Sequence, residues 1–359
     1  MSAEPRLSTY LHSRAIEKEI PISGTFELTS RCNFRCEMCY VHDECHKAEK
    51  ISTEQWLSIA NEAKQAGTLF LLLTGGEPLA REDFPFLYTE LKKMGFMLSI
   101  NTNGSLLHKH LELFKNDPPT RVNISLYGAD NETYEKLCKT NMFSQVLENI
   151  KLLKEIGISV KLNTIFTKSN SHQYKQIIDI AEAFDIPLST TAYAYPQVRL
   201  DKAFGENTGR ITPEEAAKCT VDCEKYRFRN DDFSLRAKRI LEESNDEKCD
   251  RVSCRAGRAA YWITSEGLMQ PCGMMPKIQI NVFENGFENA WKQLIAQVRE
   301  IRFPKKCTSC KYSNICHACA AMFYTETGGF DQVPEYVCQM SKSIYELTKK
   351  EQEKYSADK

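Results

Sequence analysis

The strongest constraint on this chain is a group of three cysteines near its start, Cys32, Cys36 and Cys39, spaced as C-x3-C-x2-C. Three thiolates this close can hold one small inorganic cluster, and they leave one iron of a [4Fe–4S] cubane without a protein ligand. Closed structural zinc sites use four protein ligands, so zinc here would need His42 or His46 as the fourth. The spacing therefore predicts a metal centre and favours an open iron–sulfur cluster over zinc.

A second motif lies downstream, where an apolar run that begins at Leu71 ends in Gly75, Gly76, Glu77 and Pro78. We expect the run to form a buried strand, and two glycines let a ligand approach the backbone just beyond its end. Glu77 would then present its carboxylate at the carboxyl edge of a parallel sheet, where α/β folds bind their ligands.

Together, the cysteine loop and the Gly-Gly-Glu motif resemble the radical S-adenosylmethionine (SAM) superfamily. The resemblance implies that the three loop cysteines bind a [4Fe–4S] cluster whose open iron binds SAM. The position before Cys39 departs from the family pattern, because it holds Met38 where an aromatic residue is common. The resemblance also implies that SAM is contacted by Gly75, Gly76, Glu77, Asn103, Ser125 and Lys136.

Strand-like and helical segments alternate through the first half of the sequence. Glycines that follow the helical segments, and capping residues before them, support the helix assignments. Six strand–helix units fall short of the eight of a closed barrel, so the prediction is an α/β fold with a partial (β/α)6 barrel, as the resemblance also implies. Strands are predicted at 23–29, 69–74, 96–101, 121–126, 158–166 and 187–193, and helices at 53–66, 83–94, 106–115, 143–156 and 172–184.

The region after the barrel is dense in cysteine and resembles the SPASM domain, a C-terminal extension of many peptide-modifying radical SAM enzymes. The resemblance implies two auxiliary [4Fe–4S] clusters, although eight cysteines would also satisfy two zinc sites. Cys249 is the least secure ligand, because it lies closer to Cys254 than in related sequences. The implied ligands are Cys249, Cys254, Cys272 and Cys319 for the first cluster, and Cys307, Cys310, Cys316 and Cys338 for the second.

These patterns divide the chain into five parts. We expect an N-terminal segment over 1–22, the barrel over 23–199, a bridging region over 200–248, the SPASM domain over 249–345 and a helical tail over 346–359.

The sequence offers fewer candidates for catalytic residues than for cluster ligands. Tyr193 and Tyr195 follow the last predicted barrel strand, where barrel enzymes collect substrate contacts, and a tyrosine could accept a proton. Cys45, close behind the cysteine loop, could act on the substrate. The residue after Cys272 is Gly273, whereas sulfatase-maturing relatives carry there the acid proposed to take a proton from the substrate. Formylglycine formation by that route is therefore not expected.

Three further cysteines lie outside every motif: Cys138, Cys219 and Cys223. Free cysteine commonly packs as a small apolar residue, and we expect this of Cys138. Cys219 and Cys223 are four apart, on one face if their segment is helical, so they could also replace a cluster ligand or bind substrate.

Composition narrows the class of protein. The net charge of −1 gives no electrostatic reason to bind nucleic acid or an anionic membrane surface. We see no signal peptide and no apolar stretch that could span a bilayer, so we expect a cytoplasmic protein. Fifteen cysteines in such a chain favour metal ligation over disulfides.

The prediction is a radical SAM oxidoreductase that generates a 5′-deoxyadenosyl radical and oxidatively modifies a ribosomally made precursor peptide (RiPP), by thioether, C–C or C–O cross-linking or by dehydrogenation. An external flavodoxin or ferredoxin would supply electrons. About twenty residues precede the first strand, too few for a leader-binding module, so a separate leader-recognition protein is one expected partner. The alternatives are an oxidase or decarboxylase of a small molecule such as a tetrapyrrole, and a zinc-binding protein without turnover.

Overall fold

The computed structural model describes residues 7–41, 49–242 and 250–357. Within these ranges, nine strands form one sheet. The strands are β1 (Ser23–Glu27), β2 (Phe70–Thr74), β3 (Met97–Thr102), β4 (Arg121–Ser125), β5 (Val160–Ile165), β6 (Leu188–Thr191), β7 (Ala260–Ile263), β8 (Leu268–Gln270) and β9 (Ile280–Asn281). Their order is β6-β5-β4-β3-β2-β1-β7-β8-β9, parallel from β6 to β7 and antiparallel from β7 to β9.

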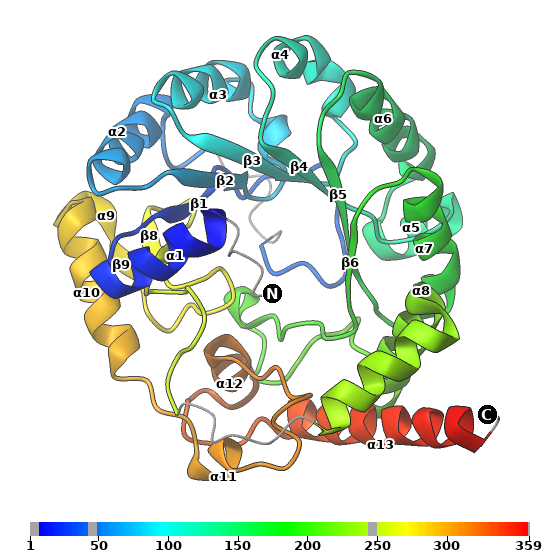
Figure 1. The fold of residues 1–359 in the computed structure, drawn as a ribbon. Helices are drawn as coiled ribbons and strands as arrows, with labels where there is room; N and C mark the ends of the chain where they lie inside the picture. Colours follow the sequence, from blue (N-terminus) through cyan, green and yellow to red (C-terminus); the bar gives the residue numbers. More distant parts are fainter. Residues whose placement is uncertain (1–6, 42–48, 243–249, 358–359) are drawn as a thin grey trace.

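Helices lie outside the strands, and the last three of them gather at one side of the molecule (Figure 1). They are α1 (Leu7–Lys18), α2 (Thr53–Gln65), α3 (Phe84–Lys93), α4 (Leu111–Asn116), α5 (Asn131–Cys138), α6 (Phe143–Glu155), α7 (Tyr174–Ala183), α8 (Pro213–Glu242), α9 (Val282–Asn285), α10 (Phe287–Arg299), α11 (Lys305–Thr308), α12 (Ala320–Thr327) and α13 (Glu335–Ala357). Short 3-10 helices are η2 (Pro78–Ala80), η3 (Leu107–His110), η4 (Ser171–Gln173) and η5 (Val198–Leu200).

The predicted α/β fold is confirmed. Six parallel strands and the intervening helices lie within a few residues of their predicted positions, and the predicted helix at 106–115 is η3 followed by α4. Before α8, two helices were not predicted, α1 and α5. After it, α9, α10, α11 and α12 were not predicted either. The predicted boundary between 345 and 346 falls inside α13, which is continuous across it.

Alternation along the strands separates an apolar outer face from a polar inner face. On β1, Phe26 is fully buried and its ring centroid lies 4.9 Å from that of Trp56 on α2. Glu27, the next residue, therefore points to the inside of the barrel. On the inner face of neighbouring strands, Asn123 donates a hydrogen bond of 2.9 Å to Asn101. The barrel interior is thus lined with groups that can hydrogen-bond a ligand.

The C-terminal region continues the barrel sheet. β7 pairs with β1 in parallel, with Ser23 opposite Ala260. Tyr261 crosses the neighbouring Gly24 so closely that a Cβ there would lie 2.3 Å from the phenol oxygen. On the outer face, the Tyr261 ring packs edge-on against Trp291 of α10 at 6.2 Å. Barrel and C-terminal region therefore share one continuous core.

In the part of the chain that the structure describes, we find no helix with the length and apolar character needed to cross a membrane.

Replacing Trp291 should weaken the attachment of the C-terminal region. The side chain is 4% exposed and its indole nitrogen donates to the Glu19 carbonyl at 2.7 Å. We expect Trp291→Ala to lower the free energy of unfolding by about 3–5 kcal/mol, because it leaves a cavity and an unpaired carbonyl. Urea unfolding followed by circular dichroism would measure this. Phe86→Ala on α3, where the side chain is 57% exposed, should cost under about 0.5 kcal/mol; equal losses would contradict the argument.

Candidate functional site

The cysteine loop leaves the end of β1 and turns back on itself so that its amides face its own sulfurs. The amide of Phe34 donates to the Cys32 sulfur at 3.3 Å, and that of Val41 donates to the Cys39 sulfur at 3.4 Å. Such bonds stabilise a sulfur that carries negative charge. The three loop cysteines are neither fully buried nor fully exposed.

The Gly-Gly-Glu motif is bonded directly to this loop. Gly76 donates its amide to the Thr29 carbonyl and Glu77 donates to that of Arg31, each at 2.7 Å. A Cβ at Gly75 would lie 2.4 Å from the Thr29 oxygen, and one at Gly76 would lie 2.1 Å from the Arg31 oxygen. Gly75 also has a φ of +149°, which favours glycine. Only glycine therefore lets the end of β2 lie against the cysteine loop.

The Glu77 carboxylate is fully buried and accepts three hydrogen bonds from the protein. They come from the amides of Leu79 at 3.1 Å and Asn103 at 2.7 Å, and from the Thr102 hydroxyl at 2.8 Å. Burial raises the pKa of Glu77 to about 7, although these bonds oppose the shift. A carboxylate has about four acceptor positions, so one remains for a ligand.

Asn103 ties the end of β3 to the cysteine loop. Its side-chain amide donates to Asn33 at 2.8 Å and lies 3.8 Å from the Cys32 sulfur, while its oxygen accepts from Ser105. Ser125 ends the next strand and hydrogen-bonds to Tyr127. These two predicted SAM contacts are thus on neighbouring strand ends near the loop.

The predicted contact from Lys136 lies differently. Lys136 is exposed on α5, and its neighbour Lys139 is the lysine that reaches the cysteine loop, by an ion pair of 2.8 Å with Glu37. The role proposed for Lys136 stays a prediction.

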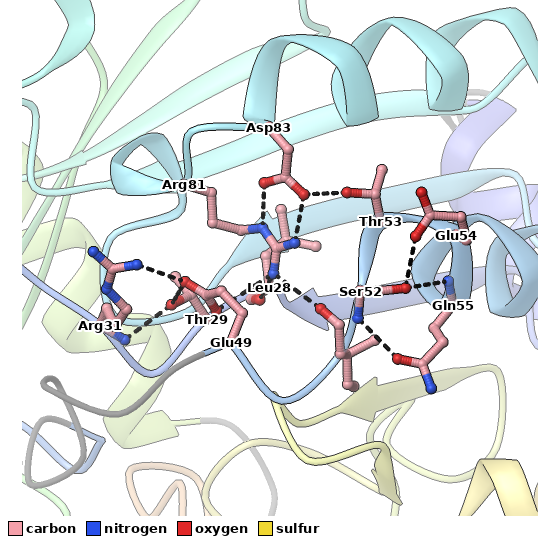
Figure 2. Close-up of polar contacts among 11 residues, drawn as sticks. Leu28, Thr29, Arg31, Glu49, Ser52, Thr53, Glu54, Gln55, Arg81 and Asp83 are labelled. Atoms are coloured by element: carbon pink, nitrogen blue, oxygen red, sulfur yellow. Dashed lines mark hydrogen bonds and ion pairs between the residues drawn. The ribbon is translucent and has the colours of Figure 1, made fainter.

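A buried arginine holds together the segments on the other side of the loop (Figure 2). Arg81, just after η2, forms a two-bond contact with Asp83 at 2.9 and 2.7 Å and donates to the Leu28 carbonyl at 2.7 Å. It also pairs with Glu49 at 3.4 Å, and Glu49 accepts from the Thr29 hydroxyl at 2.9 Å. The chain that leads into α2 is therefore anchored to the end of β1, beside the cysteine loop.

The donor set fits an iron–sulfur cluster. Burial, and then the charge of Glu77, raise the pKa of the Cys32 thiol to about 12, so a bound metal would have to displace its proton. Among the described residues, no three His, Cys, Asp or Glu side chains converge closely enough for a single metal ion. Three cysteines on one loop with amides directed at their sulfurs suit a cluster, which is wider than one ion. Cys32, Cys36 and Cys39 would hold it.

The C-terminal cysteines fall into two sets. The first comprises Cys254, Cys272 and Cys319. Burial, helped by the charge of Cys319, raises the pKa of Cys254. Burial, helped by the charges of Cys319 and Cys254, raises the pKa of Cys272 to about 12. Cys249, its predicted fourth ligand, lies outside the described residues. The second set interacts in the same way around Cys307, whose pKa burial raises to about 11, and consists of Cys307, Cys310, Cys316 and Cys338. Six of these seven cysteines line a cavity of about 460 Å³.

The two predicted tyrosines have different surroundings. The hydroxyl of Tyr195 lies 3.6 Å from the Cys319 sulfur, at the edge of the first set. The hydroxyl of Tyr193 donates to Glu326 at 2.6 Å, and Glu326 is paired with the buried Arg210. Burial raises the pKa of both tyrosines, so both keep their protons. Cys45 lies outside the described residues.

Sequence reasoning missed a buried ion pair in the barrel interior. Arg199 donates to both carboxylate oxygens of Glu27, at 2.9 and 3.1 Å, and to the Gly273 carbonyl at 3.3 Å. The Trp262 indole also donates to Glu27, at 2.7 Å, and Arg199 lies 5.4 Å from the Tyr40 ring centre. The one signal in the sequence was an acid at the end of a strand directly before the cysteine loop.

Comparison with known proteins agrees with this geometry. Residues 26–181 match the family model described as the Radical SAM superfamily. This part of the chain is therefore a radical SAM domain.

Three proteins that are similar to this chain differ in what they make or bind. An AdoMet-dependent heme synthase of Methanosarcina barkeri is 24% identical over 87% of this chain and 94% of its own length. The antilisterial bacteriocin subtilosin biosynthesis protein AlbA of Bacillus subtilis is 28% identical over 87% of this chain and 70% of its own. The crystal structure of Streptococcus suis SuiB bound to precursor peptide SuiA has a TM-score of 0.67, with 20% identity over 94% of this chain and 83% of that one. The last likeness is one of fold.

A methyl group at Gly76 should displace the cysteine loop. Because its Cβ would lie 2.1 Å from a backbone oxygen, we expect Gly76→Ala to lower iron binding by about tenfold or more, the size of effect seen when the supports of metal ligands are removed. Iron per chain after anaerobic reconstitution measures this. Gly209→Ala is the matched control, since its nearest atom would be 3.6 Å away. Full iron binding by the Gly76 variant would show that the loop does not need this contact.

Glu77 should make the stability of the iron-free protein depend on pH. Its folded pKa of about 7 lies above the ordinary value of 4.5, so the folded state binds the proton more tightly than the unfolded state. Stability should therefore fall as pH rises from about 4.5 to about 7, by about 3 kcal/mol, and change little from this group above that range. Urea unfolding at a series of pH values measures the slope. Glu77→Gln should flatten it in that window; an unchanged slope would assign it to other groups.

Proposed function

We propose that this chain is a radical SAM oxidoreductase that modifies a peptide, with a SPASM-type domain that holds two auxiliary [4Fe–4S] clusters. The proposed parts are the N-terminal segment over 1–22, the barrel over 23–199, the bridging region over 200–248, the SPASM domain over 249–345 and the tail over 346–359. The proposed partners are a peptide substrate, with or without a leader-recognition protein, and an external electron donor.

The observation that carries this proposal is the separation of the C-terminal cysteines into two interacting sets beside the open barrel. A radical SAM enzyme needs one cluster to start its reaction, so two further thiol-rich sites suit a reaction that removes electrons from the substrate. AlbA and SuiB support a peptide as the substrate, because AlbA is a bacteriocin biosynthesis protein and SuiB has been crystallised with a precursor peptide.

The chain's own residues would bind the cofactor and confine the reaction. Gly75, Gly76 and Glu77 would hold the SAM ammonium beside the loop, with Asn103 and Ser125 on the neighbouring strand ends. When bound, the cluster and SAM supply a carbon radical that removes a hydrogen atom from an unactivated C–H bond.

Inside the barrel, the ion pair of Glu27 with Arg199 lies between the cysteine loop and Gly273 and places charged groups on the inner surface. Tyr195 keeps its proton, so we assign it hydrogen-bond donation to a substrate near Cys319 rather than proton removal. Gly273 offers no acid, which sets this chain apart from the sulfatase-maturing mechanism.

A small-molecule oxidase or decarboxylase is the second candidate. It is favoured by the heme synthase relative, whose whole length this chain nearly matches. The polar barrel interior could bind the carboxylates of a tetrapyrrole as well as the amides of a peptide.

Anaerobic reconstitution followed by iron and sulfide analysis would test the proposal. We expect about twelve irons per chain and release of 5′-deoxyadenosine from SAM with dithionite. The double variant Cys254→Ala, Cys272→Ala should lose about four irons and still cleave SAM, because the first cluster does not depend on these thiols. The control is Cys219→Ala, which replaces a cysteine outside the motifs and should keep all of the irons.

The substrate class needs a separate measurement. A short peptide encoded beside the gene should lose two hydrogen atoms on incubation, as mass spectrometry would show. Turnover of a tetrapyrrole and not of the peptide would favour the second candidate. Zinc in place of iron, with no SAM cleavage, would overturn the enzyme proposal altogether.

A further inference from the structure

Strand β6 is the last strand at one end of the sheet (Figure 1). It pairs with β5 on one side, and among the described residues no strand pairs with its other side. An open strand edge presents main-chain donors and acceptors, and proteins usually cover such edges or make them unsuitable for pairing. Where an open edge is kept, an extended peptide can add to it as a further strand.

The register of β6 shows which of its main-chain groups face outward. The carbonyls of Pro187 and Thr191 accept hydrogen bonds from β5 and from the residue that follows it, at 2.9 and 2.8 Å. Successive residues of a strand direct their main-chain groups to opposite sides, so those of Leu188 and Thr190 face the open edge. Arg227 of α8 donates to the Leu188 carbonyl. For the amide and the carbonyl of Thr190, the described residues supply no partner.

A groove lies along this edge. All four residues of β6 line a cavity of about 390 Å³, and α8 and α13 supply much of its remaining wall; we call this cavity the β6 groove. Its volume lies within the range of ligand pockets, about 300–1,000 Å³. Apolar side chains are part of that wall, among them Phe228 of α8 and Met340 and Ile344 of α13. Because the side chains of an added strand alternate between two faces, every second one would lie against such groups.

The β6 groove also carries positive charge. Arg227 lies at the Leu188 carbonyl, and the guanidinium carbon of Arg236 lies 4.1 Å from the ring centre of Phe228. Of the described residues that line the groove, Glu224 is the one acid. Complementary charge steers a partner to its binding surface, so the groove favours an acidic segment over a basic one.

The carboxyl end of β6 leads directly to the candidate site. β6 ends at Thr191, and Tyr193, two residues further on, still lines the groove. Tyr195 follows, with its hydroxyl 3.6 Å from the Cys319 sulfur. In a parallel sheet the carboxyl ends of all strands meet at one edge, which here is the edge that the cysteine loop leaves from β1. A peptide that lies along β6 would therefore have one end at the edge of the sheet where the reaction takes place.

We propose that the β6 groove binds an extended, acidic segment of the peptide substrate as an added strand, which pairs with the amide and the carbonyl of Thr190. Main-chain hydrogen bonds give such a complex its affinity, and the alternate side chains in the groove give it selectivity. The bound segment positions the substrate and takes no part in the chemistry. This inference rests on the peptide substrate of the proposed function and names where on the chain that peptide binds.

Hydrogen exchange tests the pairing without any turnover. The probe is the short peptide encoded beside the gene, added to the reconstituted protein at about ten times its Kd. Deuterium exchange resolved to single residues by mass spectrometry should then show the Thr190 amide slowed by about tenfold. The amides of Ser189 and Thr191, which face β5, should change little.

Variants test the same contact by affinity, measured by isothermal titration calorimetry. Thr190→Pro should weaken peptide binding by about tenfold, because proline has no amide hydrogen and its ring occupies the space of the added strand. Thr190→Val, which keeps the amide, should recover most of the affinity. Ser189→Pro should lower the melting temperature more than Thr190→Pro does, since it removes an amide that faces β5. A copy of the peptide with its Asp and Glu replaced by Asn and Gln should bind about two- to fivefold more weakly.

The outcomes separate this inference from the proposed function. If the peptide is modified while the Thr190 amide exchanges at an unchanged rate, the inference is wrong and the proposed function stands. Equal binding by a folded Thr190→Pro protein and the parent would overturn it too, and equal binding of the neutral copy would overturn the acidic segment. If Thr190→Pro does not fold, the exchange result on the unaltered protein decides. A protein that neither binds nor modifies the peptide, and turns over a tetrapyrrole instead, would refute both.

Discussion

The candidate site depends on one backbone contact, between the end of β2 and the cysteine loop. The Thr29 and Arg31 carbonyls accept the amides of Gly76 and Glu77, and the space between the two segments has no room for a Cβ. This contact determines how close the loop lies to the sheet. It also brings Glu77 under Asn103, whose side chain in turn reaches the Cys32 sulfur. The absence of a side chain at Gly75 and Gly76 thus determines the geometry of the candidate metal site.

The barrel was predictable because its signals are local. Apolar runs such as Leu71–Leu73 and the glycines after helices, Gly95 and Gly157, lie within a few residues of what they specify. α5 was missed since it is short, polar on one side and ended by Lys139, which carries no glycine signal. Strands β7 to β9 were missed for a different reason: they contain two to four residues each, and their position is set by pairing with a strand far away in the sequence.

The same distinction applies to the site. The three loop cysteines could be recognised from their spacing, because residues of one short loop lie close together whatever the rest of the fold. The pair of Glu27 with Arg199 joins segments far apart in the sequence, and neither residue type marks it in advance. Tyr193 was a reasonable candidate by position, yet its hydroxyl is bonded to Glu326 in a network that ties the barrel to α12. Position at a strand end predicts where a residue lies, and its partners decide what it can do.

The buried ion pair explains how a site assembled from two regions can keep a fixed shape. The side chain of Glu27 is 1% exposed and that of Arg199 is 15% exposed, so each charge has lost most of its water. Such a pair adds little net stability, but removing one partner costs several kcal/mol because the other is left buried and charged. Arg199 also donates to the carbonyl of Gly273, which follows Cys272 in the sequence, and lies over the ring of Tyr40, which follows Cys39. Any movement of the C-terminal cysteines away from the loop would have to break these contacts in a place that water reaches poorly. The ion pair of Glu27 with Arg199 therefore holds the two thiol-rich regions at a fixed distance from each other, even though it adds little net stability.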